Sequence, residues 1–501
     1  MEYIAAGFNG ILDEPVIFLY LVMGILLGMI MGAIPGLTAS LAVTLALPFT
    51  YSMTHTAGIS LLVALYVGGI SGGLVSAILL NIPGTPSSLV TCFDGSPMAR
   101  KGNAHIALSL GVFASFVGGI LSAVALTFIS PMMAKIALLF GTWEYAAMGI
   151  FGLCIVVSLT GDDTIKGLAA AIIGVVLKMV GVDTLSNVPR FTFGQWQLSA
   201  GMSMLACLMG LFAMAEILEQ VRNLSQISEV RDCKRVPAFP PKETLKGNVG
   251  LFLSSSLIGI GIGILPGIGQ STSSVLAYTF AKNVSKEPQK FGTGCPEGVI
   301  ASETANNATC GGALIPMLCL GVPGDTVTAI LMGGLVVHGI TPGPLLFTRN
   351  VDLVGVVFVG YFLCNVIMYI MEWGLMKGFI NLLKVPMNYL YPIILLMCAI
   401  GTFSTNNRVF DCWVFLIIGV VGYLLRKNKF PLAPIVLGYV MGNIIETNLR
   451  TAIVSTKGDI TPWFSRPISM AFLIAGVIML CMPLLRALLG KKKAKTITIE
   501  E

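Results

Sequence analysis

Charged residues are scarce in this 501-residue sequence. Asp, Glu, Lys and Arg together make up 11% of it, whereas hydrophobic residues make up 55%. None of the four charged types occurs in residues 15–93, a run that can hold several membrane spans because about 20 apolar residues cross a bilayer. This scarcity excludes a soluble globular domain. The apolar runs lack the alternation of an outer-membrane barrel, so we expect an all-α polytopic membrane protein.

Metal-binding and disulfide patterns are also missing. The three histidines (His55, His105 and His338) lie far apart, and the eleven cysteines show no zinc or disulfide spacing. The cysteines stand mostly in apolar segments, where we expect them to be small buried hydrophobic residues. The net charge of +6 does not indicate nucleic-acid binding, because the basic residues stand in short loops beside apolar runs.

Basic residues are absent before the first apolar run, where Glu2, Asp13 and Glu14 stand instead. A cleaved signal peptide begins with a positively charged region. We therefore expect no signal peptide, and we expect the chain to insert with its N-terminus outside.

Three short motifs occur twice, in the same order and at nearly constant separation. The pairs are 32–40 with 263–271, 81–84 with 321–324, and 172–176 with 417–421. Each match is weak alone, but the shared order indicates an internal duplication. We predict a first transmembrane repeat at 1–218, a cytoplasmic linker at 219–247 and a second repeat at 248–450. Residues 451–501 would form a loop, one extra C-terminal transmembrane helix and a basic cytoplasmic tail.

Loop charge predicts the relative orientation of the repeats. The basic pair Arg100-Lys101 corresponds to the uncharged Ile340-Thr341, and the basic run 426–429 corresponds to 181–184, which has no basic residue. Basic loops mark the cytoplasmic side, so corresponding loops face opposite sides. The sequence therefore predicts two inverted-topology repeats, with sites near the membrane midplane.

Proline and glycine interrupt the apolar segments at four places. Each half contains two Pro-Gly breaks, and residues 305–324 (ANNATCGGALIPMLCLGVPG) also combine polar amides, a glycine pair and two prolines. Backbone groups that such residues leave free find no partner in hydrocarbon. Broken or re-entrant helices at membrane depth are typical of transport sites.

The N-terminus of a half-helix attracts anions through its free amides and its dipole. No arginine falls within the break motifs, so backbone and hydroxyl groups would hold the anion, which suits carboxylates. The predicted substrate-binding residues are Pro35, Gly36, Thr38, Ser40, Asn81, Pro83, Gly84, Thr85, Ser87, Pro266, Gly267, Gln270, Ser271, Pro323, Gly324, Asp325 and Thr326.

Oxygen donors suitable for a small hard cation stand beside the fourth break. They are Asn306, Asn307, Thr309 and Asp325, which we predict to coordinate Na+. Asp325 is the only acid between Thr304 and Arg349 and is a functional candidate at membrane depth. Alternatively it caps the helix that it begins, and the two roles can coexist. We expect Glu297 and Glu303 to line the entrance or to cap helices.

Nine motifs, taken together, resemble the large membrane subunit of tripartite tricarboxylate transporters, the TctA family. They are LPG (265–267), EGV (297–299), ANNA (305–308), GGALIP (311–316), VPG (322–324), HGITPGP (338–344), NIPGTP (81–86), PMAR (97–100) and RFTFG (190–194). The resemblance covers nearly the whole chain in order. Gln270 and Asp325 depart from it, because the family more often has a small residue and a hydroxyl there, and Ser302 stands where the family often has proline.

This resemblance implies a permease of the bacterial inner (cytoplasmic) membrane, a transporter and not an enzyme. It implies two partners, a small TctB-like membrane subunit and a periplasmic TctC-like solute-binding protein, and it leaves homo-oligomerisation open. It also implies uptake of citrate-like tri- or dicarboxylates by symport with Na+ or H+, without a tightly bound cofactor. The sequence contains no Walker motif for ATP.

Two other functions remain open at this point. A stand-alone anion carrier or channel would need no binding protein. An intramembrane aspartyl protease is more remote: Pro323-Gly324-Asp325 resembles the Gly-x-Gly-Asp signature, but no second aspartate stands in a matching apolar helix.

Overall fold

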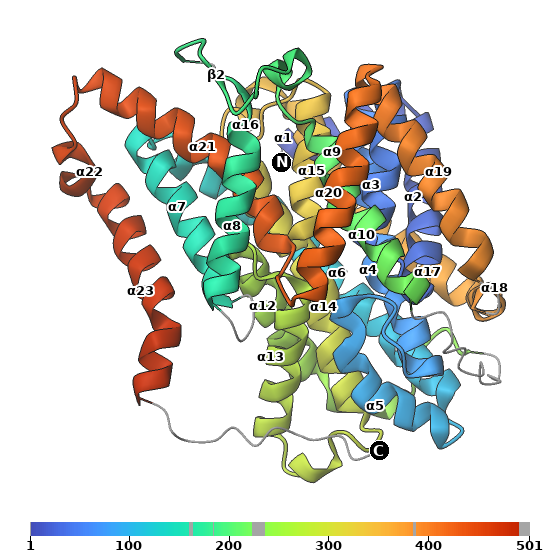
Figure 1. Ribbon diagram of the computed structural model, residues 1–501. Helices are drawn as coiled ribbons and strands as arrows, with labels where there is room; N and C mark the ends of the chain where they lie inside the picture. Colours follow the sequence, from blue (N-terminus) through green and yellow to red (C-terminus); the bar gives the residue numbers. More distant parts are fainter. Residues whose placement is uncertain (1, 160–163, 184, 223–235, 384–386, 490–501) are drawn as a thin grey trace. The chain divides into compact units, whose positions relative to one another are not determined.

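The computed structural model describes residues 2–159, 164–183, 185–222, 236–383 and 387–489. Most of them form helices (Figure 1). Among the described residues, six segments are long and apolar enough to cross a membrane: α2 (Val16–Ala33), α4 (His55–Leu80), α6 (Ala104–Ala137), Met204–Val221, α17 (Val351–Gly374) and α20 (Val409–Lys427). The prediction of an all-α polytopic membrane protein is confirmed.

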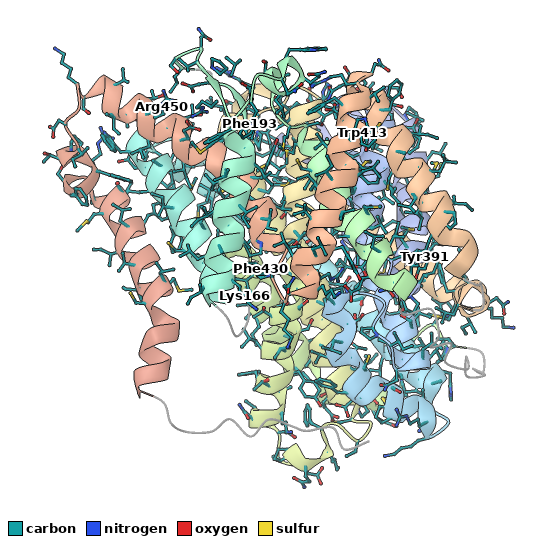
Figure 2. The ribbon with its side chains drawn as sticks, viewed as in Figure 1. Lys166, Phe193, Tyr391, Trp413, Phe430 and Arg450 are labelled. Carbon is teal, nitrogen blue, oxygen red and sulfur yellow. The ribbon has the colours of Figure 1, made fainter. Side chains whose placement is uncertain are left out.

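Large apolar side chains remain exposed on the helix surfaces. Trp413 on α20 is 59% exposed, Phe128 on α6 is 71% exposed and Leu257 is 70% exposed. Figure 2 draws the Trp413 side chain on its helix. Apolar surface of this extent suits hydrocarbon better than water.

The chain divides into two compact units, each built from two separate stretches. Unit 1 is Met1–Leu139 with Val180–Leu432, and unit 2 is Phe140–Met179 with Ala433–Glu501. These units are defined by which helices pack together, whereas the predicted repeats are defined by recurring sequence motifs. The repeat boundaries therefore remain predictions. Of the predicted linker, 223–235 lies outside the described residues, and so does most of the basic tail, 490–501.

Unit 2 contains α7 (Thr142–Leu159), α8 (Thr164–Met179), α21 (Ala433–Ser455), α22 (Thr461–Ser465) and α23 (Pro467–Leu489). Helix α21 packs against α7 and α8, and α23 packs against α7. A Cβ on Gly174 would lie 1.9 Å from the carbonyl oxygen of Ile435, so the backbones of α8 and α21 touch there. Arg466 forms an ion pair with the buried Glu144 at 3.1 Å.

Unit 1 begins with helices from the first half of the sequence. In order they are α1 (Glu2–Asp13), α2, α3 (Ala39–Thr50), α4, η1 (Pro86–Ser88), α5 (Leu89–Arg100) and α6. After a short hairpin of β1 (Gly181–Val182) and β2 (Pro189–Arg190) come η2 (Trp196–Ala200), α9 (Met204–Met209), η3 (Gly210–Met214) and α10 (Ala215–Arg222).

The second half of the sequence supplies the remaining helices of unit 1. It gives α11 (Lys242–Gly247), α12 (Val249–Ile264), α13 (Gly269–Val284), η4 (Pro288–Lys290), α14 (Pro296–Leu320), α15 (Thr326–Val337), α16 (Leu346–Arg349), α17, α18 (Met376–Leu382), α19 (Met387–Asn406) and α20. In each half, a helix, a break and a second helix precede a long buried helix, which is α4 in the first half and α14 in the second.

Glycines let these long helices pack closely. A Cβ on Gly72 of α4 would lie 2.5 Å from the carbonyl oxygen of Met29 on α2, and one on Gly312 of α14 would lie 2.6 Å from that of Ile260 on α12. The glycine pairs in α4 and α14 therefore serve close helix packing.

Two helices continue through a proline in their interior. Residues 305–320, part of the stretch expected to be broken, lie in continuous helix α14, and the chain leaves the helix only after Leu320. Gly312 and Pro316 do not end the helix, because the surrounding helices pack closely enough to hold it together. Helix α6 likewise continues through Pro131 to Ala137.

The helices that follow the breaks pair across the halves of the sequence. Helix α3 contacts α15, while α5 and η1 contact α13. Figure 1 draws α3 and α15 toward one end of unit 1, and α5 and α13 toward the other. The helices that follow the first break of each half, α3 and α13, thus lie at opposite ends of unit 1, and so do α5 and α15, which follow the second breaks.

Candidate functional site

The two breaks of each half pack against each other through glycine. A Cβ on Gly84 would lie 2.2 Å from the carbonyl oxygen of Gly32, at the end of α2. In the second half, a Cβ on Gly324 would lie 2.5 Å from the carbonyl oxygen of Gly263, and the amide of Gly267 donates to the oxygen of Gly324 at 2.8 Å. No larger residue fits at Gly84 or Gly324 without moving backbone.

Both second breaks have the same local structure. Asn81 directly follows α4 and Gly321 directly follows α14, each in the left-handed conformation (φ 60° and 68°). Thr85 and Ser88 then form a capping box, and Asp325 and Thr328 form the corresponding one. The amide of Thr328 donates to Oδ1 of Asp325 at 2.6 Å. The interpretation of Asp325 as a helix cap is confirmed.

Asp325 also bonds across the halves. The hydroxyl of Tyr66 on α4 and Nε2 of Gln270 on α13 both donate to its Oδ2. All three side chains are buried. Both oxygens of Asp325 therefore already have partners.

Tyr66 is not among the site residues that the sequence predicted. It is the only tyrosine in α4, which is otherwise apolar and rich in glycine. A buried tyrosine hydroxyl needs a hydrogen-bond partner, so a lone tyrosine in such a helix was the available signal.

The predicted hydroxyl residues occupy different environments. Thr38 caps α3, accepting from the amide of Leu41 at 3.2 Å, and Ser40 follows it in the first turn. Ser87 is buried, 3.1 Å from the hydroxyl of Thr85. Thr326 is half-buried beside the Asp325 cap, whereas Ser271 is exposed.

Other residues around the breaks are partly accessible. Pro35, Gly36, Pro83 and Pro266 are half-buried, Asn81 is exposed and Pro323 is buried. A Cβ on Gly36 would lie 2.6 Å from the side chain of Gln220 on α10, so Gln220 lies directly against the first break. Sequence reasoning did not include Gln220.

The predicted cation ligands on α14 lie in mid-helix and are fully buried. The hydroxyl of Thr309 donates to the oxygen of Ala305 at 2.7 Å and lies 2.6 Å from that of Ser273. The side-chain oxygens of Asn306 and Asn307 have no hydrogen-bond partner in the described part of the chain. Thr309 is thus engaged within the protein, whereas the two amide oxygens can still accept.

The acids at the start of α14 differ from expectation. Glu297, in the first turn, is half-buried and accepts from the thiol of Cys295 at 2.8 Å. Glu303 lies two turns further on, is fully buried and accepts from Thr91, Ser115 and Asn306. The expectation that Glu303 lines the entrance or caps a helix is therefore wrong, because α14 begins well before it and other helices enclose it.

Known proteins are similar to this chain over most of its length. The model of the family described as "Tripartite tricarboxylate transporter TctA family" matches residues 18–437. An uncharacterized 52.8 kDa protein in the TAR-I ttuC' 3' region of Agrobacterium vitis is 34% identical over 432 residues, which is 86% of each chain. An uncharacterized protein in the TAR-II ttuC' 3' region of the same organism is 34% identical over 231 residues, covering 46% of this chain and 96% of its own. No solved structure matches.

Proposed function

The chain belongs to the tripartite tricarboxylate transporter TctA family, and from this premise we propose that it is the large permease subunit of a secondary transporter that takes up carboxylates. The observation that carries the proposal is the pairing of Pro-Gly breaks within each half, with a capped half-helix after each second break. A multi-pass membrane protein with interrupted helices in its interior suits alternating access around a central site.

Carboxylate is the substrate chemistry that the breaks favour. Helices α3 and α13 begin at or directly after a break, where helix N-terminal amides and the helix dipole attract anions. Helix α15 also follows a break, but the Asp325 carboxylate already caps its N-terminus. Among the described residues, no Lys, Arg or His side chain is buried. The substrate's negative charge is therefore held by amides and by hydroxyls such as Thr38 and Ser87.

The two halves act as inverted repeats around this site. The matched capping boxes of Thr85 and Asp325 and the opposite ends occupied by α3 and α13 support this arrangement. Uptake is driven by Na+, with H+ as the alternative ion, and Asn306, Asn307, Thr309 and Asp325 are the candidate ligands. Two of these, Asn306 and Asn307, have buried oxygens that can still accept.

The working transporter contains two further proteins, a small TctB-like membrane subunit and a periplasmic TctC-like solute-binding protein. It resides in the bacterial inner membrane with the C-terminus of this chain in the cytoplasm. The family match supports this assignment in general terms. The alternative, a stand-alone anion carrier or channel, requires neither partner.

Reconstitution tests the proposal directly. Proteoliposomes containing the chain and both partners should accumulate labelled di- or tricarboxylates when an inward Na+ gradient is imposed, and omission of the binding protein should abolish uptake. Equal uptake by the chain alone would favour the stand-alone carrier. Absence of uptake of every carboxylate tested, with all three components folded, would contradict the proposal.

A further inference from the structure

A loop of exposed aromatic residues follows β2. We call residues 191–196 the aromatic loop, and it contains most of the RFTFG motif, which has no role in the site at the breaks. Phe191 is 49% exposed, Phe193 is 84% exposed and Trp196 is 78% exposed. Large apolar side chains that gather in one exposed segment mark an interaction surface.

The backbone of the aromatic loop is strained. Phe191 and Phe193 both adopt the left-handed conformation (φ 52° and 48°), which bulky residues rarely adopt. The amide of Gln195 donates to the oxygen of Thr192 at 2.8 Å and closes a turn around Phe193. Such strain persists only where the surrounding structure imposes it, and it is typical of functional segments. The loop therefore keeps its rings exposed at a conformational cost.

The two ends of the aromatic loop are held together. Before the loop, β1 and β2 pair, with Gly181 opposite Arg190. After it, η2 contacts β1, and a Cβ on Gly181 would lie 2.9 Å from Cα of Gly201. The rings therefore stand on a closed base.

The loop lies level with the start of a membrane span. Nη2 of Arg408 donates to the backbone oxygen of Gln197, the residue after Trp196, at 2.6 Å. Helix α20 begins at the next residue, Val409, and is long and apolar enough to cross the membrane. The headgroup layer on each side of the hydrocarbon is about 5–8 Å thick. A loop bonded to the residue that precedes a span therefore lies within this layer.

The surface of α20 beside this bond already faces lipid. Val409 is 63% exposed, and Trp413, one turn further along the helix, is also largely exposed. Because Gln197 is bonded to Arg408, the aromatic loop adjoins this apolar surface at the end of the helix. The bilayer that covers the start of α20 therefore extends to the loop.

The charge around the loop also suits a lipid surface. Residues 180–203 contain only two charged side chains, and one of them, Asp183, is buried and pairs with the other, Arg190, at 3.7 Å. Arg408 donates to a neutral carbonyl oxygen and so keeps its positive charge beside the loop. Aromatic rings at the boundary of the hydrocarbon, with a basic side chain near the lipid phosphates, are the combination that binds a membrane surface.

We propose that the aromatic loop inserts its three rings into the boundary between headgroups and acyl chains of the outer leaflet, with Arg408 contacting lipid phosphate. The side follows from α20, because its other end carries the basic run 426–429 that is expected in the cytoplasm. Figure 1 draws β2 at the end of unit 1 opposite to α5. A docked soluble protein would also cover exposed rings, but the bond from Arg408 to Gln197 holds the loop at the depth of the headgroups.

Tryptophan fluorescence of the full chain in lipid vesicles tests this placement. The contribution of Trp196 is the difference between the emission of the wild type and that of Trp196→Phe, a conservative change at an exposed position. Lipids brominated in the upper part of the acyl chain should remove most of this contribution, whereas iodide on both sides of the vesicle should quench it little. Trp413→Phe is the positive control on the lipid-facing surface of α20, and Trp143→Phe is the negative control, because Trp143 is buried.

A second probe keeps the test independent of one variant. Phe193→Trp, compared with the wild type, adds a tryptophan to the same loop, and its emission should also be lost in brominated lipid if Trp196→Phe fails to fold. Quenching of the loop by iodide but not by brominated lipid overturns the proposal. Protection from iodide that appears only after a soluble binding protein is added also overturns it and assigns the loop to protein docking.

Discussion

The hydroxyl of Tyr66 donates a hydrogen bond to Oδ2 of Asp325, joining a helix from the first half of the sequence to the cap of a helix in the second. Both side chains are buried, and Gln270 donates to the same oxygen. Movement of one half against the other would have to break or rearrange this contact. One carboxylate therefore both caps α15 and takes part in the contact between the halves.

Tyr66→Phe should destabilise the protein by about 1–3 kcal/mol, because it removes a donor to a buried carboxylate without changing the ring. We expect a lower unfolding temperature in detergent and slower uptake in proteoliposomes. Tyr20→Phe, at a half-buried position on α2, is the control. Unchanged stability and uptake in Tyr66→Phe would show that the bond is dispensable.

Asp325→Asn and Asp325→Ala separate the cap from the charge. Asparagine is as good a helix cap as aspartate, whereas loss of the cap in the alanine variant should cost about 0.5–2 kcal/mol. We expect the asparagine variant to keep the cap and to be more stable than the alanine variant, but to lose most uptake, because its Nδ2 cannot accept the hydrogen bonds from Tyr66 and Gln270. Wild-type transport by Asp325→Asn would leave Asp325 with a capping role alone.

Sequence patterns predicted the features that depend on local chemistry. Long apolar runs predicted the helices. The Pro-Gly pairs at Pro83 and Pro323 predicted interruptions, because proline and glycine disrupt the helix in which they stand. The cap at Asp325 followed from its position just before an apolar run.

Features that depend on distant partners could not be predicted in this way. Pro316 does not break α14, because tight contacts with other helices hold the helix together around it. The sequence predicted that Glu303 lines an entrance or caps a helix. In the structure its carboxylate accepts from Thr91 on α5 and Ser115 on α6, and these helices enclose it. The partner of Tyr66 lies in the other half of the chain, and nothing near Tyr66 in the sequence identifies it.

Gly324→Leu should abolish uptake while the protein still inserts into the membrane. A Cβ at this position already meets the oxygen of Gly263 at 2.5 Å and the backbone of Ala313 at 2.6 Å, so a larger side chain must separate the third and fourth breaks. Gly261→Leu on α12 is the control, because no atom lies within 4 Å of a Cβ there. Membrane content by immunoblot and uptake by labelled substrate measure the two effects; equal uptake by both variants would contradict the assignment.

Asp94 anchors the loop before α14, and Asp94→Ala should release it. Oδ1 of Asp94 accepts from the amides of Gly292, Gly294 and Cys295 at 2.7 to 2.9 Å, and Oδ2 accepts from the hydroxyl of Tyr278 at 2.9 Å. Two of these donors belong to the buried residues Cys295 and Tyr278, and each buried donor left unpaired costs about 1–3 kcal/mol, so the total should be about 2–6 kcal/mol.

Faster limited proteolysis within residues 285–295 and a lower unfolding temperature would report the release of this loop. Glu287→Ala, which removes an exposed carboxylate from the same loop, should change neither measurement. Equal proteolysis rates for Asp94→Ala and the wild type would show that the loop is held by other contacts.

Single-cysteine labelling tests the inverted topology. Asn103 and Thr341 are exposed and lie in corresponding loops of the two halves. In a background without other cysteines, a membrane-impermeant maleimide added to intact cells should label Thr341→Cys, and should label Asn103→Cys only after permeabilisation, because the neighbouring Arg100 and Lys101 mark a cytoplasmic loop.

Lys286→Cys provides the matched control for this labelling. Nζ of Lys101 donates to the oxygen of Thr293 at 2.7 Å, so the loop that contains Lys286 lies on the same side as Asn103 and must label with it. Native Cys295 in this loop would react slowly in any case, because burial and then its hydrogen bond to Glu297 raise its pKa to about 12. If Asn103→Cys and Thr341→Cys were labelled from the same side while Lys286→Cys followed Asn103→Cys, the halves would share one orientation. The breaks would then not be related by the inversion that alternating access around a common site requires.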